Sequence, residues 1–296
     1  VTHFFMHNRL FSYVKAALKG VGQVMLQEHV LTGILFLSGI FWGSVTMGVS
    51  ALLALVSGFI TVWAFKLPKD NLYKGLYSFS AVLVGVAVML FFKPVFLSWL
   101  LVILGSMAAT LLQHFFIKKS FPAFTFPFVV VTWVLLALAG QDMRLPSGVA
   151  GDQMVGIYAW LFVPFKSFGQ VIFQEKILSG FLFFVGVLIS TPVAAAYGLV
   201  SAAAAGTVAY LLGAPADAVT AGLYGFNAVL CTIVFAGTKW QDALWVLVSV
   251  AVSLGVTFLF FAWGLPQLTF PFVLATWVTL GLKRVMRRNR VRRNRI

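Results

Sequence analysis

The chain carries Gly22-Gln23-Val24-Met25-Leu26-Gln27-Glu28 and, 147 positions later, Gly169-Gln170-Val171-Ile172-Phe173-Gln174-Glu175. A second block, residues 75–83 (Gly-Leu-Tyr-Ser-Phe-Ser-Ala-Val-Leu), recurs at the same offset in residues 222–230 (Gly-Leu-Tyr-Gly-Phe-Asn-Ala-Val-Leu). A third, Phe-Pro-Ala-Phe-Thr-Phe-Pro-Phe at 121–128, recurs as Leu-Pro-Gln-Leu-Thr-Phe-Pro-Phe at 265–272, 144 positions later. Chance similarity between apolar segments does not keep Gln, Glu, Thr, Gly and Pro in register through three blocks. The sequence therefore predicts two tandem copies of one unit.

The composition places both copies in a membrane. Of the 296 residues, 61% are hydrophobic and only 9% charged, and the mean hydropathy is +1.00. Residues 30–65, 177–216 and 243–282 contain no Asp, Glu, Lys or Arg. At about 1.5 Å per residue, each run is too long for one helix across a hydrocarbon layer of roughly 30 Å. Each run should form two spans, broken near Gly43, Pro192 or Pro266.

The repeat and the hydropathy together predict the domain organisation. Residues 1–20 form an amphipathic lead-in, 21–140 the first transmembrane repeat, 141–165 an extracytoplasmic linker, 166–282 the second repeat and 283–296 a basic cytoplasmic tail. We expect five spans in each repeat and about ten in all. Because five is odd, the second copy should be inverted relative to the first.

The distribution of basic residues predicts the orientation. With both termini in the cytoplasm, 17 of the 21 Lys and Arg residues face the inside, as the positive-inside rule requires. Eight of them lie in the tail, between Lys283 and Arg295. The net charge of +14 is therefore interpreted as a topology signal and a contact for anionic membrane lipid, and no nucleic-acid partner is expected.

Three pairs of polar residues recur in both copies: Gln23 and Gln170, Glu28 and Glu175, and Thr125 and Thr269. A polar side chain within a membrane is costly unless it is paired or lines a wet cavity. Any one of these Gln or Thr residues could simply form a hydrogen bond that joins neighbouring helices. Their repetition favours a site at the bilayer midplane between the repeats.

Matching apolar residues accompany them. Phe79 and Leu83 share a helical face, as do Phe226 and Leu230. Packed core or lipid contact is the simpler explanation for Phe in a chain that has 31 of them. The copies differ at Leu26 and Phe173, so any lining at that point should be asymmetric.

The two carboxylates have alternative interpretations. Glu28 and Glu175 could relay protons in an active carrier, cap helix N-termini near the interface, or hold the two halves together; we favour the capping role. The sequence shows no nucleophile elbow, phosphate loop or HExxH motif, and its His residues and lone Cys231 do not have the spacing of a metal site. We therefore expect neither an enzyme nor a metal or other cofactor.

The repeated blocks resemble those of the urea transporter family. The resemblance rests on Gly-Gln-Val at 22–24 and 169–171, on Gly-Leu-Tyr-x-Phe-x-Ala-Val-Leu at 75–83 and 222–230, and on Leu-Pro-x-x-Thr at 265–269, which has Phe for Leu at 121–125. It implies a homotrimer with one pore per subunit, built in each half from five spans and a re-entrant pore helix.

The resemblance also implies the residues that line the pore. One site would contain Gln23, Val24, Leu26, Phe79, Leu83 and Thr125, and the other Gln170, Val171, Phe173, Phe226, Leu230 and Thr269. The chain departs from the family pattern at Ser80, where the family usually has Asn, and at Leu26, where an aromatic residue is common.

These observations predict passive urea transport through a pore between the repeats, in a bacterial cytoplasmic membrane. Paired Phe rings would select a flat solute, and Thr, Gln and freed backbone oxygens would accept hydrogen bonds from its amino groups. Alternatives are a channel for another small neutral solute such as an amide, ammonia or water, a proton-coupled carrier, and a scaffold that transports nothing.

Overall fold

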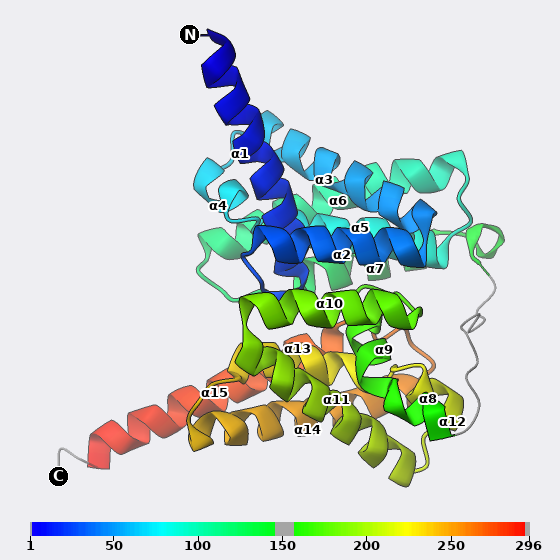
Figure 1. The fold of residues 1–296 in the computed structure, drawn as a ribbon, viewed down its shortest axis with the longest axis vertical. Helices are drawn as coiled ribbons and strands as arrows, with labels where there is room; N and C mark the ends of the chain where they lie inside the picture. Colours follow the sequence, from blue (N-terminus) through cyan, green and yellow to red (C-terminus); the bar gives the residue numbers. More distant parts are fainter. Residues whose placement is uncertain (1, 146–156, 294–296) are drawn as a thin grey trace.

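The computed structural model describes residues 2–145 and 157–293, which contain helices and no β-strand (Figure 1). The first half comprises α1 (Thr2–Gly22), η1 (Gln23–Met25), α2 (Val30–Gly43), α3 (Val45–Ala64), α4 (Lys69–Tyr73), α5 (Ser78–Phe91), α6 (Phe96–Lys118), α7 (Phe126–Leu138) and η2 (Gln141–Met143). The second half comprises α8 (Ile157–Leu161), α9 (Val163–Gln170), α10 (Ile177–Ser190), α11 (Pro192–Leu211), α12 (Ala216–Thr220), α13 (Phe226–Phe235), α14 (Trp240–Ala262) and α15 (Phe270–Arg293). The prediction of an all-helical fold is confirmed.

Several helices are suited to cross a membrane. Among the described residues, α3, α6, α11 and α14 have 20 to 23 residues and are apolar enough to span it. The helices α2, α5, α7, α10 and α13 are apolar but shorter, with 10 to 14 residues each. Residues 10–25 and 30–43 pass the same test together but are bent by 74°, as a broken span or a re-entrant segment would be. The chain is therefore a multi-pass membrane protein.

The two halves lie one above the other in Figure 1, with α2 and α10 facing each other between them. The Thr32 hydroxyl donates a hydrogen bond of 2.7 Å to the Gly186 carbonyl, and the Ser179 hydroxyl donates one of 2.8 Å to the Gly39 carbonyl. Early residues of each helix thus meet late residues of the other. The helices α2 and α10 are therefore antiparallel.

Small residues permit this close packing. A side chain at Gly39 would lie 2.5 Å from the ring of Phe183, and one at Gly186 would lie 2.7 Å from the ring of Phe36. The two rings meet edge to face with their centroids 5.2 Å apart. Glycine lets the helices approach until hydroxyls reach backbone carbonyls, which is a common way to join helices in a membrane.

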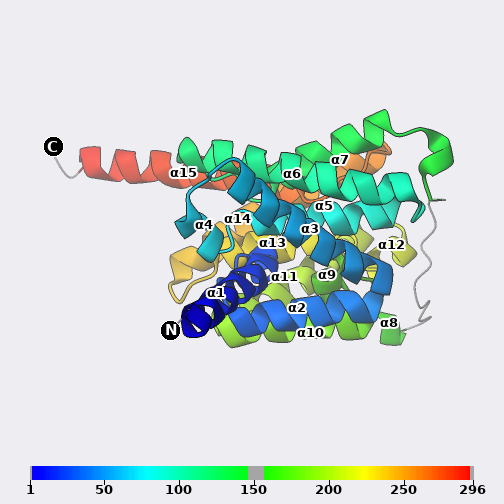
Figure 2. The same ribbon diagram turned by 90° about the horizontal axis from the view of Figure 1, so that it is seen from above.

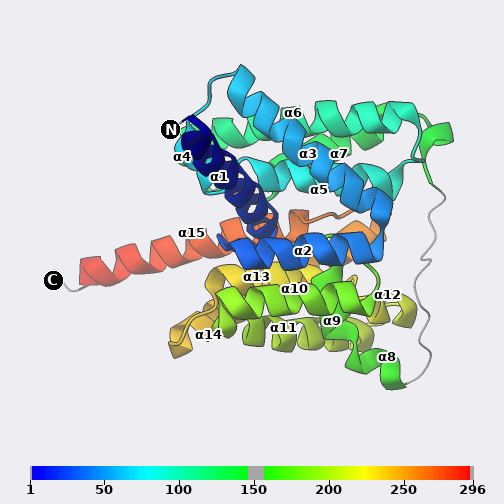
Figure 3. The same ribbon diagram turned by 45° about the horizontal axis from the view of Figure 1, so that its top comes forward.

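Both ends of the described chain lie at one end of the helical bundle. In Figures 2 and 3, the start of α1 and the end of α15 are on the same side, and α8 and α12 are on the opposite side. The short helix α4, which begins at Lys69, lies on the side of the termini in Figure 2. Its counterpart α12 lies on the far side, so the equivalent turns face opposite ends of the bundle.

The segments expected at the two ends and between the halves continue into neighbouring helices. The lead-in is part of α1, which continues to Gly22, and the basic tail continues α15 as far as Arg293 without a break. Of the expected linker 141–165, residues 146–156 lie outside the described residues, and most of the others form η2, α8 and the first turn of α9.

Candidate solute pathway

Each half contains a sharp turn at its repeated Gly-Gln-Val block. In the first half, Leu26 has φ +57° and its amide donates to the Gln23 carbonyl at 3.0 Å. The Gln27 amide donates to the Gly22 carbonyl at 3.1 Å, so the last turn of the helix closes on itself as a Schellman motif does. A side chain at Gly22 would lie 2.5 Å from the Gln27 carbonyl oxygen, which explains the glycine.

The second half repeats this turn. Phe173 has φ +58°, its amide donates to the Gln170 carbonyl at 3.1 Å, and the Gln174 amide donates to the Gly169 carbonyl at 3.0 Å. Glycine is usual in the left-handed position, because a side chain there costs about 1 kcal/mol or more. Both halves nevertheless hold a large side chain at this position, which points to a use for Leu26 and Phe173 beyond forming the turn.

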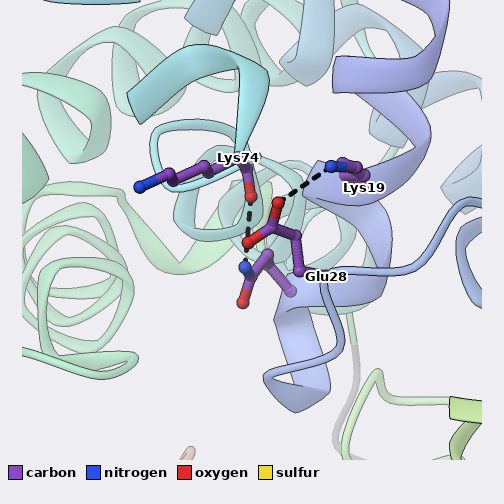
Figure 4. Close-up of polar contacts among 4 residues, drawn as sticks. Lys19, Glu28 and Lys74 are labelled. Carbon is purple, nitrogen blue, oxygen red and sulfur yellow. Dashed lines mark hydrogen bonds and ion pairs between the residues drawn. The ribbon is translucent and has the colours of Figure 1, made fainter. Parts of the chain in front are cut away.

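Gln23 and Gln170 make equivalent hydrogen bonds. The Gln23 Nε2 donates to the Lys74 carbonyl at 3.1 Å (Figure 4). The Gln170 Nε2 donates to the Ala221 carbonyl, also at 3.1 Å. These carbonyls precede Gly75 and Gly222, which have φ +76° and +84°. Each Gln is thereby fixed by its amide nitrogen, and its Oε1 makes no hydrogen bond within the part of the chain that the structure describes. An acceptor is left for a solute.

Thr125 and Thr269 meet each other. Each lies directly before its helix, α7 or α15, which has a proline at its second residue. The two hydroxyl oxygens are 2.6 Å apart, and both side chains are buried. The preceding residues, Phe124 and Leu268, have φ +50° and +46°, so the chain turns sharply into each helix. The predicted threonine pair is thus a direct contact between the halves.

Two tryptophans reinforce this contact. The Trp133 Nε1 donates to the Pro266 carbonyl at 2.9 Å, and the Trp277 Nε1 donates to the Pro122 carbonyl at 2.8 Å. Each indole therefore reaches the segment that leads into the other half's threonine. Sequence reasoning did not single out these tryptophans, although they too lie 144 positions apart.

The apolar candidates lie in one continuous core that crosses both halves. This core contains Val24, Phe79, Leu83, Val171, Phe173, Phe226 and Leu230. Phe173 also packs against Phe91 and Phe128, whereas Leu26 is 36% exposed. Among the described residues, neither Phe79 nor Phe226 has another aromatic ring packed against it. Their rings are buried without being stacked on each other.

The halves differ beside these rings. Asn227 Nδ2 donates to the Gln267 Oε1 at 3.3 Å, and Asn227 Oδ1 accepts from the Phe272 amide at 3.2 Å. In the first half, the Ser80 hydroxyl instead donates to the Gln113 Oε1 at 3.4 Å. Sequence reasoning missed Gln113 and Gln267. The signal was weak, because Gln113 is one of several polar residues of α6 and stands beside His114, while Gln267 corresponds to Ala123.

The carboxylates do not cap helices as we expected. Glu28 forms an ion pair with Lys19, with Nζ and Oε1 2.8 Å apart (Figure 4), and the side chain of His29 caps α2. The residue before α10 is Lys176, and no side chain caps that helix. The Lys19 cation balances the charge of Glu28. Within the described ranges, no group of His, Cys, Asp and Glu could hold a metal ion.

Comparisons with known proteins identify the family of this chain. A family model described as urea transporter matches residues 14–284. Urea transporter 1 of sheep (Ovis aries) is 24% identical over an alignment that covers 91% of this chain and 77% of that protein. Urea transporter 1 of rat (Rattus norvegicus) is also 24% identical, with coverage of 90% and 76%. The chain belongs to the urea transporter family.

Proposed function

We propose that this chain conducts urea passively across a membrane, through a narrow uncharged passage between its two halves. The observation that carries the proposal is the contact between Thr125 and Thr269, since it places equivalent polar groups from both halves at one point in an apolar core. Membership of the urea transporter family supplies the solute. The protein is a transporter and not an enzyme.

The chemistry of the passage suits urea, which is flat and neutral and carries two amino groups. A solute that leaves water for an apolar pore must have its hydrogen bonds replaced. The Oε1 atoms of Gln23 and Gln170 and the threonine hydroxyls are acceptors for the amino groups. The rings of Phe79 and Phe226 admit a flat molecule and exclude a hydrated ion. The remaining lining residues would be Val24, Leu26, Leu83, Val171, Phe173 and Leu230.

The two halves, residues 21–140 and 166–282, are proposed to be inverted repeats of five spans. Support comes from the antiparallel packing of α2 and α10, whose sequences correspond. A two-fold axis that relates equivalent antiparallel helices runs across them, and it would lie in the membrane plane if both helices cross the membrane. The bent α1–α2 segment would be the re-entrant element of the first half.

Orientation and assembly complete the proposal. Both termini would face the cytoplasm of a bacterium, because the basic tail and the lysines near α4 lie at the same end of the bundle (Figure 2). The tail would contact anionic lipids of the cytoplasmic membrane. Following the family, the assembly would be a homotrimer with one pore per subunit.

Purified protein in liposomes tests the function. When urea is added outside, water leaves and the vesicles shrink, and urea entry then refills them. This refilling should be far faster than in protein-free vesicles, as followed by light scattering in a stopped-flow instrument. Urea should come to equal concentrations on both sides and go no further. A refilling rate equal to that of protein-free vesicles would exclude urea conduction.

The same vesicles distinguish the alternatives. Water, ammonia and a small amide can each replace urea as the gradient, and a channel for another neutral solute would conduct one of them faster than urea. A proton-coupled carrier would accumulate urea when a pH gradient is imposed. Lys19 pairs with Glu28, so Glu175 is the candidate carboxylate that such a carrier would use without this ion pair.

A further inference from the structure

We propose that Gln27 and Gln174 are positioning residues that set the selectivity of the pathway. Each buried amide would clamp the left-handed turn of its own half against a break between two helices of the opposite half. The inference rests on the proposed function and deepens it. It concerns the two Gln residues of the repeated blocks to which the pathway assigns no contact with solute.

Gln27 connects its own turn to the second half. Its Nε2 donates to the Met25 carbonyl at 2.8 Å, and its Oε1 accepts from the Thr191 hydroxyl at 2.8 Å. Thr191 is the single residue between α10 and α11. The side chain of Gln27 is 2% exposed. The Gln27 amide therefore folds back across the left-handed Leu26 and also bonds the residue between α10 and α11, which lies 164 residues away.

Gln174 makes the reciprocal connection. Its Nε2 donates to the Ile172 carbonyl at 2.9 Å and lies 3.2 Å from the Met47 sulfur. A side chain at Gly43 would lie 1.8 Å from its Oε1, so this amide packs directly on the break between α2 and α3. Gln174 is also 2% exposed. Both Gln residues thus bond back to their own turn and contact a helix break of the opposite half, Gln27 through a hydrogen bond from Thr191 and Gln174 through packing on Gly43.

The position of these clamps explains why they should matter for the solute. The carbonyls that accept from Gln27 and Gln174 belong to the residues just before Leu26 and Phe173. Two residues before each of these carbonyls lies Gln23 or Gln170. A left-handed turn with a large side chain is strained and persists only where its surroundings hold it. The clamp supplies that restraint from the other half, so it fixes the spacing between the two halves of the pathway.

A purely structural role would give a different result. A buried amide that only stabilises the fold affects how many protein molecules are active, and it lowers the flux of every solute by the same factor. A residue that positions the lining changes the flux of solutes of different size by different factors. The permeability ratio of methylurea to urea separates the two roles, because it does not depend on the number of active molecules.

The experiment uses the full-length protein in liposomes with Gln27→Met, Thr191→Val and the combined variant. Thr191→Ser keeps the hydroxyl and serves as the conservative rescue. Thr61→Val is the matched control, since Thr61 is buried and bonds only within its own helix, to the Ser57 carbonyl at 2.8 Å. Wild-type urea flux above that of protein-free vesicles is established first, so a failure of the proposed function is recognised separately.

We expect Gln27→Met and Thr191→Val each to change the methylurea-to-urea ratio by about fivefold, the factor that corresponds to one typical hydrogen bond. The combined variant should match Gln27→Met alone, because Gln27→Met already removes the hydrogen bond from Thr191. Thr191→Ser and Thr61→Val should keep the wild-type ratio. An unchanged ratio in Thr191→Val, with urea flux intact in the wild type, would overturn the inference.

Discussion

The hydroxyl oxygens of Thr125 and Thr269 lie 2.6 Å apart, although the residues are 144 positions apart in the chain. Each is the residue before a helix. The segment before each threonine accepts a hydrogen bond from a tryptophan of the other half. A residue that meets its own counterpart lies at the boundary that the two halves share. In the proposed pathway, a solute moving between the halves would pass these hydroxyls and exchange their mutual hydrogen bond for bonds of its own.

This relationship yields the first prediction. Thr125→Val or Thr269→Val keeps the shape of the side chain and removes the acceptor, so each should lower urea permeability about tenfold, the equivalent of about 1.4 kcal/mol. Each single variant also leaves one buried hydroxyl unpaired, which should cost about 1 kcal/mol of unfolding free energy. Stopped-flow light scattering and thermal unfolding in detergent measure the two effects.

The double variant makes the prediction sharper. With valine at both positions no hydroxyl is left unpaired, so part of the stability should return while the urea flux stays low. Thr61→Val provides the comparison, because it removes a buried hydroxyl that bonds only within α3. Wild-type flux in both single variants would contradict a role for these hydroxyls in conduction.

The repeated blocks predict which residues of the two halves are equivalent. The offset between the blocks pairs Gln23 with Gln170 and Thr125 with Thr269, and the apolar runs predict the positions of most helices to within a few residues. Repetition does not say which pairs touch. The threonines meet, whereas Phe79 and Phe226 do not stack. This difference depends on how the two halves pack, which the sequence of one copy does not determine.

The left-handed turns support a second prediction. Leu26→Gly should keep or raise stability, because glycine relieves the left-handed strain by about 1 kcal/mol and Leu26, at 36% exposure, loses little packing. Phe173→Gly should lower stability by about 3 kcal/mol, because the ring packs against Phe91 and Phe128. Thermal unfolding measures the difference. Equal losses in the two variants would show that both side chains are packed alike.

A third prediction concerns the ion pair. Glu28→Gln removes a carboxylate whose partner Lys19 is partly exposed, so the loss of unfolding free energy should be below about 1 kcal/mol. Urea flux should be retained by Glu28→Gln and by its combination with Glu175→Gln. In vesicles with an imposed pH gradient, the inside and outside urea concentrations should become equal in wild type and variants. Accumulation by wild type that is lost in the double variant would instead establish proton coupling.

Glu28 and Ser80 show what the sequence does not reveal. A carboxylate just before an apolar run suggests a cap, yet His29 takes the cap and Glu28 pairs with Lys19, nine residues earlier. At position 80, where the family usually has Asn, the structure brings Gln113 from α6 to Ser80. A compensating residue on another helix cannot be recognised until the helices are placed side by side.

That compensation supports the last prediction. Asn227 and Gln267 hold the start of α15 in the second half, and the positions equivalent to them are Ser80 and Ala123. Gln113 corresponds to Thr257, which is buried with no hydrogen-bond partner in the described part of the chain. Ser80→Asn alone must displace Gln113 from a filled space, so it should cost about 1 to 3 kcal/mol. The triple variant Ser80→Asn, Gln113→Thr and Ala123→Gln reproduces the second half's arrangement, and it should return to within about 1 kcal/mol of wild type in thermal unfolding. If the triple variant loses the sum of the single losses, the three positions are independent and Gln113 does not replace the missing amide.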